Sequence, residues 1–152
     1  MKVWVDADAL PGGIKDIILR AAQRLKLQTV LVANKNLAVG LGPHVSFVRV
    51  TQGPDVADAY IHDRSNPADC CITADVPLAA ALVAKGLKVI DPRGELYSPD
   101  TIGERLAMRD LMTGLREAGV PTEGPPPFSP KAKQKFAALF DRVLSQALRR
   151  PA

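Results

Sequence analysis

The strongest constraint on the fold is the alternation of short apolar runs with amphipathic segments over the first 90 residues. Apolar runs cover residues 3–5, 29–33, 70–73 and 87–90, and a weaker run covers 45–50. Each run has the length of a strand, and stretches with helical periodicity separate most of them. Strands that alternate with helices form parallel sheets with helices on both faces, joined by right-handed crossovers. We therefore expect an α/β three-layer sandwich with a mainly parallel, five-stranded sheet.

Five segments have the periodicity or the end residues of helices. We expect helices over about 14–25, 55–64, 77–85, 101–117 and 131–149. Residues 119–130 are rich in Pro and Gly and predict an extended connector. The expected organisation is therefore one α/β domain over residues 1–118, followed by a connector and a C-terminal helix (119–152) that packs back on the same domain.

Composition narrows the protein class. The chain has 152 residues, the size of one domain, and no apolar run approaches the roughly 20 residues that span a bilayer. The N-terminus lacks the features of a signal peptide, so we expect a cytoplasmic protein without a membrane segment. The two cysteines, Cys70 and Cys71, are adjacent within a predicted strand and point to opposite faces, which suits buried thiols better than a disulfide or a zinc site.

The net charge of +4 is unevenly distributed. Residues 1–100 contain 11 basic and 11 acidic side chains, whereas residues 101–152 contain 9 and 5. A basic segment beside an acidic site suits an enzyme that acts on a phosphodiester polymer, and Lys131, Lys133 and Lys135 are then the candidate nucleic-acid contacts. The alternative, equally open, is that the excess charge only keeps a small protein soluble.

Polar side chains follow three of the predicted strands. Asp6 and Asp8 follow the first strand, the pair Asn34-Lys35 follows the second, and Asp75 follows the fourth. Ligands of open α/β sheets bind in the crevice outside the carboxyl ends of the strands. Alternate residues of an extended backbone point the same way, so Asp6 and Asp8 could face one cation. The simpler alternative is that they cap the helix that follows.

Two further acids begin the second helix. Asp55 occupies a natural N-cap position, and Asp58 stands three residues later, where a capping box has its acid. Alternatively, Asp58 faces the same crevice as the acids at the strand ends. The sequence leaves both interpretations open.

Several carboxylates in one crevice would repel each other by about 4 kcal/mol for a pair roughly 4 Å apart at an effective dielectric constant near 20. A divalent cation or raised pKa values would have to relieve this repulsion. A site made of oxygen atoms alone favours Mg²⁺ or Mn²⁺ over zinc. Such a cation could polarise a phosphodiester and activate water.

Four motifs in order along the chain resemble the YaiI/YqxD family of uncharacterised bacterial proteins. They are Val-Asp-Ala-Asp-Ala (5–9), Gly-Pro-Asp-Val-Ala-Asp (53–58), Ile-Thr-Ala-Asp-Val-Pro-Leu-Ala (72–79) and Gly-Pro-Pro-Pro-Phe (124–128). The resemblance implies a PIN-like nuclease domain that holds Mg²⁺ or Mn²⁺ on acids at three places. The matching positions are Asp6 or Asp8, Asp55 or Asp58, and Asp75, with Thr73 as a hydroxyl partner. Members often have Cys where this chain has Leu10.

The leading hypothesis is a metal-dependent nuclease that acts on RNA. In it Asp6, Asp8, Asp58 and Asp75 bind the ion, and Asp55 assists or caps the helix. A phosphatase of the haloacid dehalogenase type would match the Asp-x-Asp pair at 6 and 8, but it expects Thr or Val at position 10 and an insertion before the first helix. A non-catalytic nucleic-acid-binding module, working through the C-terminal basic residues, is the alternative from a different class.

Overall fold

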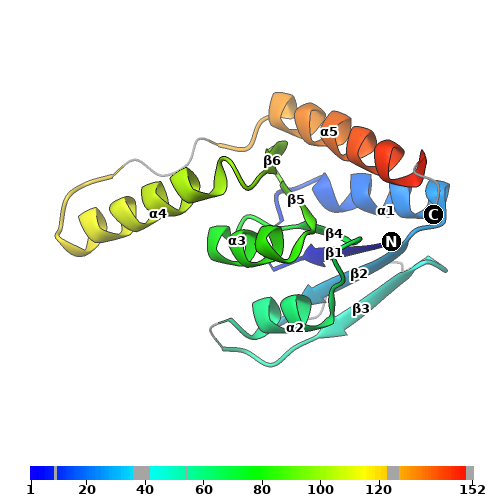
Figure 1. The fold of residues 1–152 in the computed structure, drawn as a ribbon, viewed down its shortest axis with the longest axis horizontal. Helices are drawn as coiled ribbons and strands as arrows, with labels where there is room; N and C mark the ends of the chain where they lie inside the picture. The colour runs from blue at the N-terminus through cyan, green and yellow to red at the C-terminus, as the bar shows by residue number, and fades with distance from the viewer. Residues whose placement is uncertain (9, 36–41, 54, 123–126, 150–152) are drawn as a thin grey trace.

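The computed structural model describes residues 1–8, 10–35, 42–53, 55–122 and 127–149, and Figure 1 shows their arrangement. One sheet contains the strands β1 (Lys2–Asp6), β2 (Gln28–Ala33), β3 (Val45–Arg49), β4 (Cys70–Ile72), β5 (Lys88–Asp91) and β6 (Glu95–Tyr97). The helices are α1 (Ile14–Leu25), α2 (Val56–Arg64), α3 (Val76–Lys85), α4 (Ile102–Glu117) and α5 (Pro130–Arg149). The protein is thus an α/β protein with a mostly parallel sheet.

The expected count of five strands is wrong, because the sheet has six. The additional strand, β6, pairs antiparallel with β5 after a tight turn, whereas the other neighbouring strands pair parallel. Gly94 in this turn has φ +91°, and a Cβ there would lie 2.7 Å from the backbone of α5. Glycine therefore allows both the turn and the close approach of α5. A strand of three residues is too short to produce a periodic pattern in the sequence.

The order of the strands places a crevice beside β1. The order is β3-β2-β1-β4-β5-β6, so β2 and β3 lie on one side of β1 within the sheet, and β4 and β5 lie on the other side. Strand β3, which corresponds to the weaker apolar run, lies at an edge of the sheet. The strand order reverses between β1 and β4. The loops that follow these two strands lead in opposite directions and leave a crevice at the carboxyl ends of the strands.

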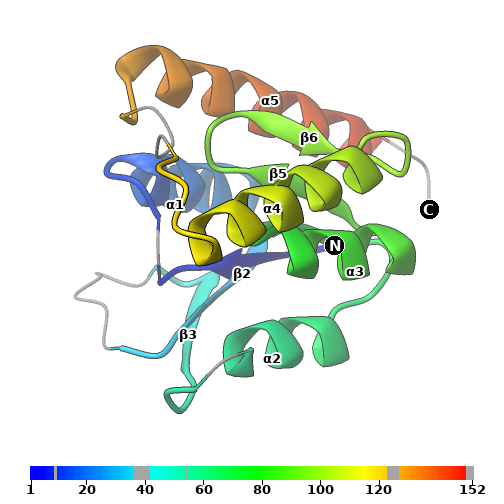
Figure 2. The same ribbon diagram turned by 90° about the vertical axis from the view of Figure 1, so that its left-hand side faces the viewer.

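Apolar side chains form two cores, one on each face of the sheet. Val5 and Leu31 pack with α1 and α5, whereas Trp4 and Val32 pack with α2 and α3. Helices α1 and α5 lie side by side (Figures 1 and 2). The adjacent cysteines divide between the two cores and are both free thiols, which confirms the prediction for this pair.

Helix α4 differs from the other helices. It contacts α3 but has no buried residue, and it projects from the rest of the molecule (Figure 1). In the part of the chain that the structure describes, no helix is long and apolar enough to cross a membrane. Residues 36–41 after β2, residues 123–126 of the expected connector, residues 150–152, and motif positions 9 and 54 lie outside the described residues.

Candidate functional site

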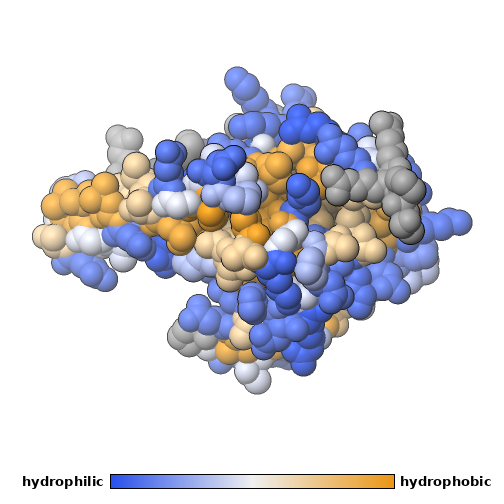
Figure 3. All heavy atoms as spheres, in the orientation of Figure 1, coloured by the Kyte–Doolittle hydropathy of each residue, from blue (hydrophilic) through white to orange (hydrophobic). Residues whose placement is uncertain are grey.

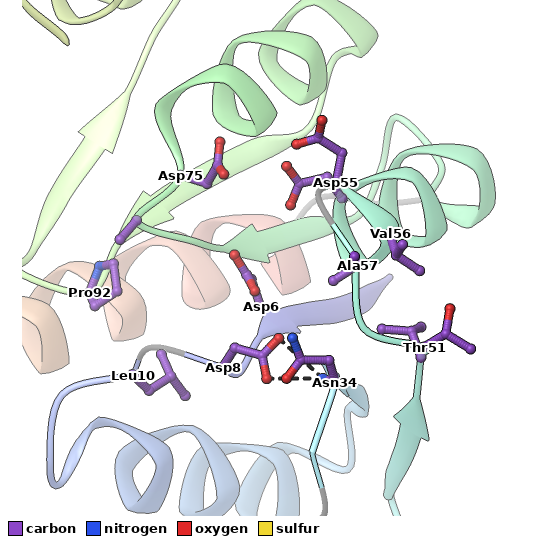
Figure 4. A pocket seen from close by; sticks show the side chains of 14 residues that line it. Asp6, Asp8, Leu10, Asn34, Thr51, Asp55, Val56, Ala57, Asp75 and Pro92 are labelled. Carbon is purple, nitrogen blue, oxygen red and sulfur yellow. Dashed lines mark hydrogen bonds between the residues drawn. The ribbon is translucent and has the colours of Figure 1, made fainter. Parts of the chain in front are cut away.

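A pocket of about 370 Å³ lies at the carboxyl ends of the strands, between β1, the start of α2 and the start of α3. Five carboxylates and one amide that the sequence analysis singled out line it: Asp6, Asp8, Asn34, Asp55, Asp58 and Asp75. In Figure 4 the side chains of Asp6 and Asp75 point toward the same space, and Asp8 turns toward Asn34. The fold therefore brings residues up to 69 positions apart in the chain, Asp6 and Asp75, to one pocket.

Thr73 connects the acid that ends β1 with the acid that begins α3. Its buried hydroxyl donates a hydrogen bond to Asp6 Oδ2 (2.9 Å) and accepts one from the backbone N–H of Asp75 (3.0 Å). Burial raises the pKa of Asp6, the hydrogen bond from Thr73 lowers it, and the negative charges of Asp75 and Asp8 raise it further. The direct carboxylate partner of the Thr73 hydroxyl is therefore Asp6.

Asp8 is held by the neighbouring strand end. The backbone N–H of Asn34 donates to both carboxylate oxygens of Asp8, at 2.9 and 3.1 Å. Asn34 follows β2, which pairs with β1, so the register of these two strands fixes the position of Asp8. The Asn34 contribution that the structure records is therefore a backbone donor.

Asp55 does not cap α2, as one of the two interpretations of the sequence had it, whereas Asp75 caps the next helix, α3. Asp55 precedes α2 but makes no capping hydrogen bond, and its φ of +63° is unusual for a residue other than glycine. Asp75 Oδ1 accepts a hydrogen bond from the backbone N–H of Leu78 (3.0 Å) and caps α3. The capping box of Asp55 with Asp58 is therefore wrong, because the backbone before α2 does not have the extended geometry of an N-cap.

Asp58 has the most perturbed pKa among the acids of the pocket. Burial raises the pKa of Asp58 to about 7, assisted by the negative charges of Asp75, Asp6 and Asp55 and by a hydrogen bond with Asp75. A carboxyl group with this pKa exchanges its proton near neutral pH. It is therefore suited to accept or donate a proton in a reaction.

The structure leaves some expected residues outside the pocket. Lys35 is exposed and does not line it. Lys131, Lys133 and Lys135 lie exposed on α5, where Lys135 Nζ is 3.9 Å from Glu95 Oε1. These lysines are on a different element from the acids and do not contribute to the pocket wall.

Other residues that line the pocket were not predicted from the sequence as site residues. Thr51 and Val50 follow the end of β3, and Pro92 follows β5. Val50 ends the predicted third strand, and Thr51 and Pro92 come soon after the predicted third and fifth strands, but none of the three has a charged side chain that would mark it as a site residue. Asp91, at the end of β5, makes its hydrogen bonds within the β5–β6 hairpin: its carboxylate accepts from Tyr97 Oη (3.0 Å) and from the backbone N–H of Arg93 (2.6 Å).

The donor set of the pocket consists of oxygen atoms, which suits a hard cation such as Mg²⁺ or Mn²⁺. Across the described ranges, no three His, Cys, Asp or Glu side chains are already spaced to hold a metal ion. Mg²⁺ keeps several waters and commonly binds proteins through only one or two carboxylates. The chemistry of the residues therefore fits such an ion, provided that water or a ligand completes its coordination.

Fold and pocket together define an α/β protein with an acidic site at the reversal point of a mostly parallel sheet. The family model described as "Uncharacterized BCR, YaiI/YqxD family" matches residues 4–146, and the chain belongs to this family. A UPF0178 protein of Geobacter sulfurreducens is 52% identical over 151 residues, which cover 99% of this chain and 100% of the relative. A UPF0178 protein of Myxococcus xanthus is 49% identical over 149 residues, 98% of this chain and 97% of the relative. No solved structure matches the chain.

Proposed function

We propose that the acidic pocket binds Mg²⁺ or Mn²⁺ and hydrolyses phosphodiester bonds in nucleic acid, with RNA as the first substrate to test. The observation that carries the proposal is the convergence of Asp6, Asp8, Asp58 and Asp75 from three parts of the chain on one pocket. The raised pKa values of Asp6 and Asp58 support it: burial is their main cause and the neighbouring carboxylates add to it, so a bound cation would stabilise the charged form of both groups.

We also interpret the architecture as PIN-like. The sheet order, with β1 and β4 adjacent, supports this interpretation, as do acids at the end of β1, in α2 and just after β4. These are the places at which the motif resemblance implies metal-binding acids. Asp6, Asp8 and Asp75 would hold the cation, which when bound would polarise a phosphodiester and activate water.

The protein's own groups have distinct tasks in this proposal. The Asn34 backbone N–H holds the carboxylate of Asp8, and the Thr73 hydroxyl orients that of Asp6. Asp58, which lines the same pocket, is the carboxyl group to which we assign the proton of the attacking water. Asp55, which is exposed, lines the pocket and makes no capping bond, is available to position substrate or water.

One observation favours the alternative of a non-catalytic nucleic-acid-binding module. The described carboxylates are not spaced as a complete metal-binding set, so binding could depend on the lysines of α5 alone. This alternative predicts RNA binding that survives Asp75→Asn without any effect of a divalent cation. It is therefore distinguished from the nuclease by the response to metal.

The test measures the melting temperature against Mn²⁺ concentration for the wild type and for Asp8→Asn. A cation that binds only the folded state stabilises it by about 2.7 kcal/mol at a hundredfold excess over its Kd, which corresponds to a shift of about 5–10 °C. We expect this shift in the wild type, its loss in Asp8→Asn, and cleavage of a labelled RNA that EDTA stops.

The matched control is Asp100→Asn, which removes an exposed carboxylate outside the pocket. It should keep the full shift with Mn²⁺. An unchanged melting temperature of the wild type up to millimolar Mn²⁺ would refute the metal site and leave the binding module as the better explanation.

A further inference from the structure

The turn between β5 and β6 carries an arginine, Arg93, beside the acidic pocket. Pro92, the residue before it, lines the pocket. The carboxylate of Asp91 fixes the turn, because it accepts hydrogen bonds from the backbone N–H of Arg93 (2.6 Å) and from Tyr97 Oη (3.0 Å). Gly94, the residue after Arg93, lies close to the backbone of α5. The backbone of Arg93 is therefore held between the pocket and α5.

An aromatic ring supports the side chain of Arg93. Its guanidinium carbon Cζ lies 5.8 Å from the centroid of the Phe128 ring, within the range of a cation–π contact. Phe128 packs in turn against the core on the α1 and α5 face of the sheet. Glu95, the acid two residues along the chain, pairs with Arg105 (2.8 Å) and Lys135 (3.9 Å). Within the described ranges Arg93 forms no ion pair, so its charge can serve a bound anion.

A second cation lies on the same side of the pocket. In Figure 4, Leu10 and Pro92 lie together on one side of the pocket, opposite Val56. Lys133 of α5 lies against Gly13, three residues after Leu10. Figure 3 shows hydrophilic side chains along the upper side of α5. Positive charge therefore borders the acidic pocket on the side of α5.

We propose that Arg93 binds a phosphate group of the nucleic acid and so positions the strand across the acidic pocket. This inference rests on the proposed function, which places the scissile bond at the acids. A guanidinium presents its N–H donors as a planar fork that fits a phosphate, and stacking on a ring leaves these donors free. A contact of this kind offsets the repulsion that the carboxylates exert on the strand. Arg93 contacts no reacting atom and is thus a positioning residue.

The first experiment measures binding of a fluorescent single-stranded oligouridylate by anisotropy at several salt concentrations, in EDTA so that no cleavage occurs. Arg93→Gln should weaken binding and reduce the slope of log K against log salt concentration by about 0.7, the value for one phosphate of a single strand. Arg93→Lys should keep the slope, because it keeps the charge, but should bind more weakly than the wild type, because lysine lacks the planar fork.

The matched control is Arg64→Gln. The guanidinium of Arg64 also lies over a ring, 4.0 Å from the centroid of Tyr60, but Arg64 is on α2 and does not line the pocket. Its replacement removes the same charge and should leave the slope unchanged. Circular dichroism establishes that each variant is folded.

Cleavage with Mn²⁺ separates this inference from the proposed function. If the wild type cleaves RNA, Arg93→Gln should raise KM about tenfold with little change in kcat, because it removes binding that the substrate and the transition state share. If the wild type binds RNA without cleaving it, the nuclease proposal fails, and the salt slope still decides whether Arg93 contacts a phosphate. The inference is overturned if Arg93→Gln keeps the wild-type slope, if Arg64→Gln reduces the slope equally, or if Arg93→Lys loses it.

Discussion

At the scale of single residues, Asp58 links the pocket to pH. The pKa of Asp58 is about 7 in the folded protein, whereas the pKa of an Asp in an unfolded chain is near 3.8. Between these values the folded state binds more protons than the unfolded state, so the free energy of unfolding falls as pH rises from about 4 to about 7. Well above pH 7, Asp58 is ionised in both the folded and the unfolded state, so this group causes no further fall in the free energy of unfolding.

Asp58→Asn should therefore stabilise the metal-free protein at pH 8 and flatten its stability between pH 4 and 7. Asp6, whose pKa is also raised, keeps part of the slope. The measurement is the melting temperature in EDTA across this pH range, with Asp100→Asn as the control. A slope for Asp58→Asn equal to that of the wild type would contradict the raised pKa of Asp58, which burial and the neighbouring carboxylates cause.

At the scale of secondary-structure elements, the Thr73 hydroxyl ties the end of β1 to the start of α3. Thr73→Val removes a donor to Asp6 and an acceptor for the Asp75 N–H. We expect a loss of about 1–3 kcal/mol in the free energy of unfolding. If the metal proposal holds, Mn²⁺ affinity should fall by about 10–100-fold, the usual effect of removing a group that orients a ligand.

Urea unfolding and Mn²⁺ titration measure these two effects separately. Thr29→Val is the matched control, because Thr29 is also buried in the sheet region and donates to the Leu27 carbonyl (3.2 Å) far from the acids. It should lose stability without losing Mn²⁺ affinity. Equal losses of affinity in both variants would show that Thr73 acts only through general stability.

The sequence predicted those elements that are long enough to carry a pattern. The apolar runs became β1 to β5, and the acids that follow them meet at one edge because parallel strands share their carboxyl ends. Strand β6 was missed because its three residues carry no periodicity, and Tyr97 is tied to Asp91 by a hydrogen bond that exists only in the hairpin.

Local conformation explains why Asp75 caps its helix and Asp55 does not. Asp55 and Asp75 have the same residue type and both precede a helix, so composition does not separate them. Only Asp75 has the extended backbone of a cap, with φ −80° and ψ 110°, whereas Asp55 is left-handed. Backbone angles of this kind depend on the surrounding loop, which the sequence pattern does not specify.

At the scale of the whole molecule, the basic excess lies on a different element from the acidic pocket but not far along the surface from its loops. Lys133 lies against the start of α1: a Cβ on Gly13 would be 2.7 Å from its Nζ. Leu10, three residues before Gly13, lines the pocket. A strand of RNA that reached the acids could therefore keep its phosphates near the lysines of α5, which would offset the repulsion from the carboxylates.

Replacing Lys131, Lys133 and Lys135 by Gln tests this arrangement. If each lysine binds one phosphate of a single-stranded RNA, the triple variant should reduce the slope of log K against log salt concentration by about 2. Fluorescence anisotropy in EDTA measures the slope without cleavage. The control replaces Lys2, Lys26 and Lys88, which are exposed near the amino ends of the strands, on the side of the sheet away from the pocket. It removes the same net charge. If both triple variants reduce the slope equally, the basic charge acts only through its total. If only the α5 variant reduces the slope, the lysines of α5 contact the phosphates of the nucleic acid directly.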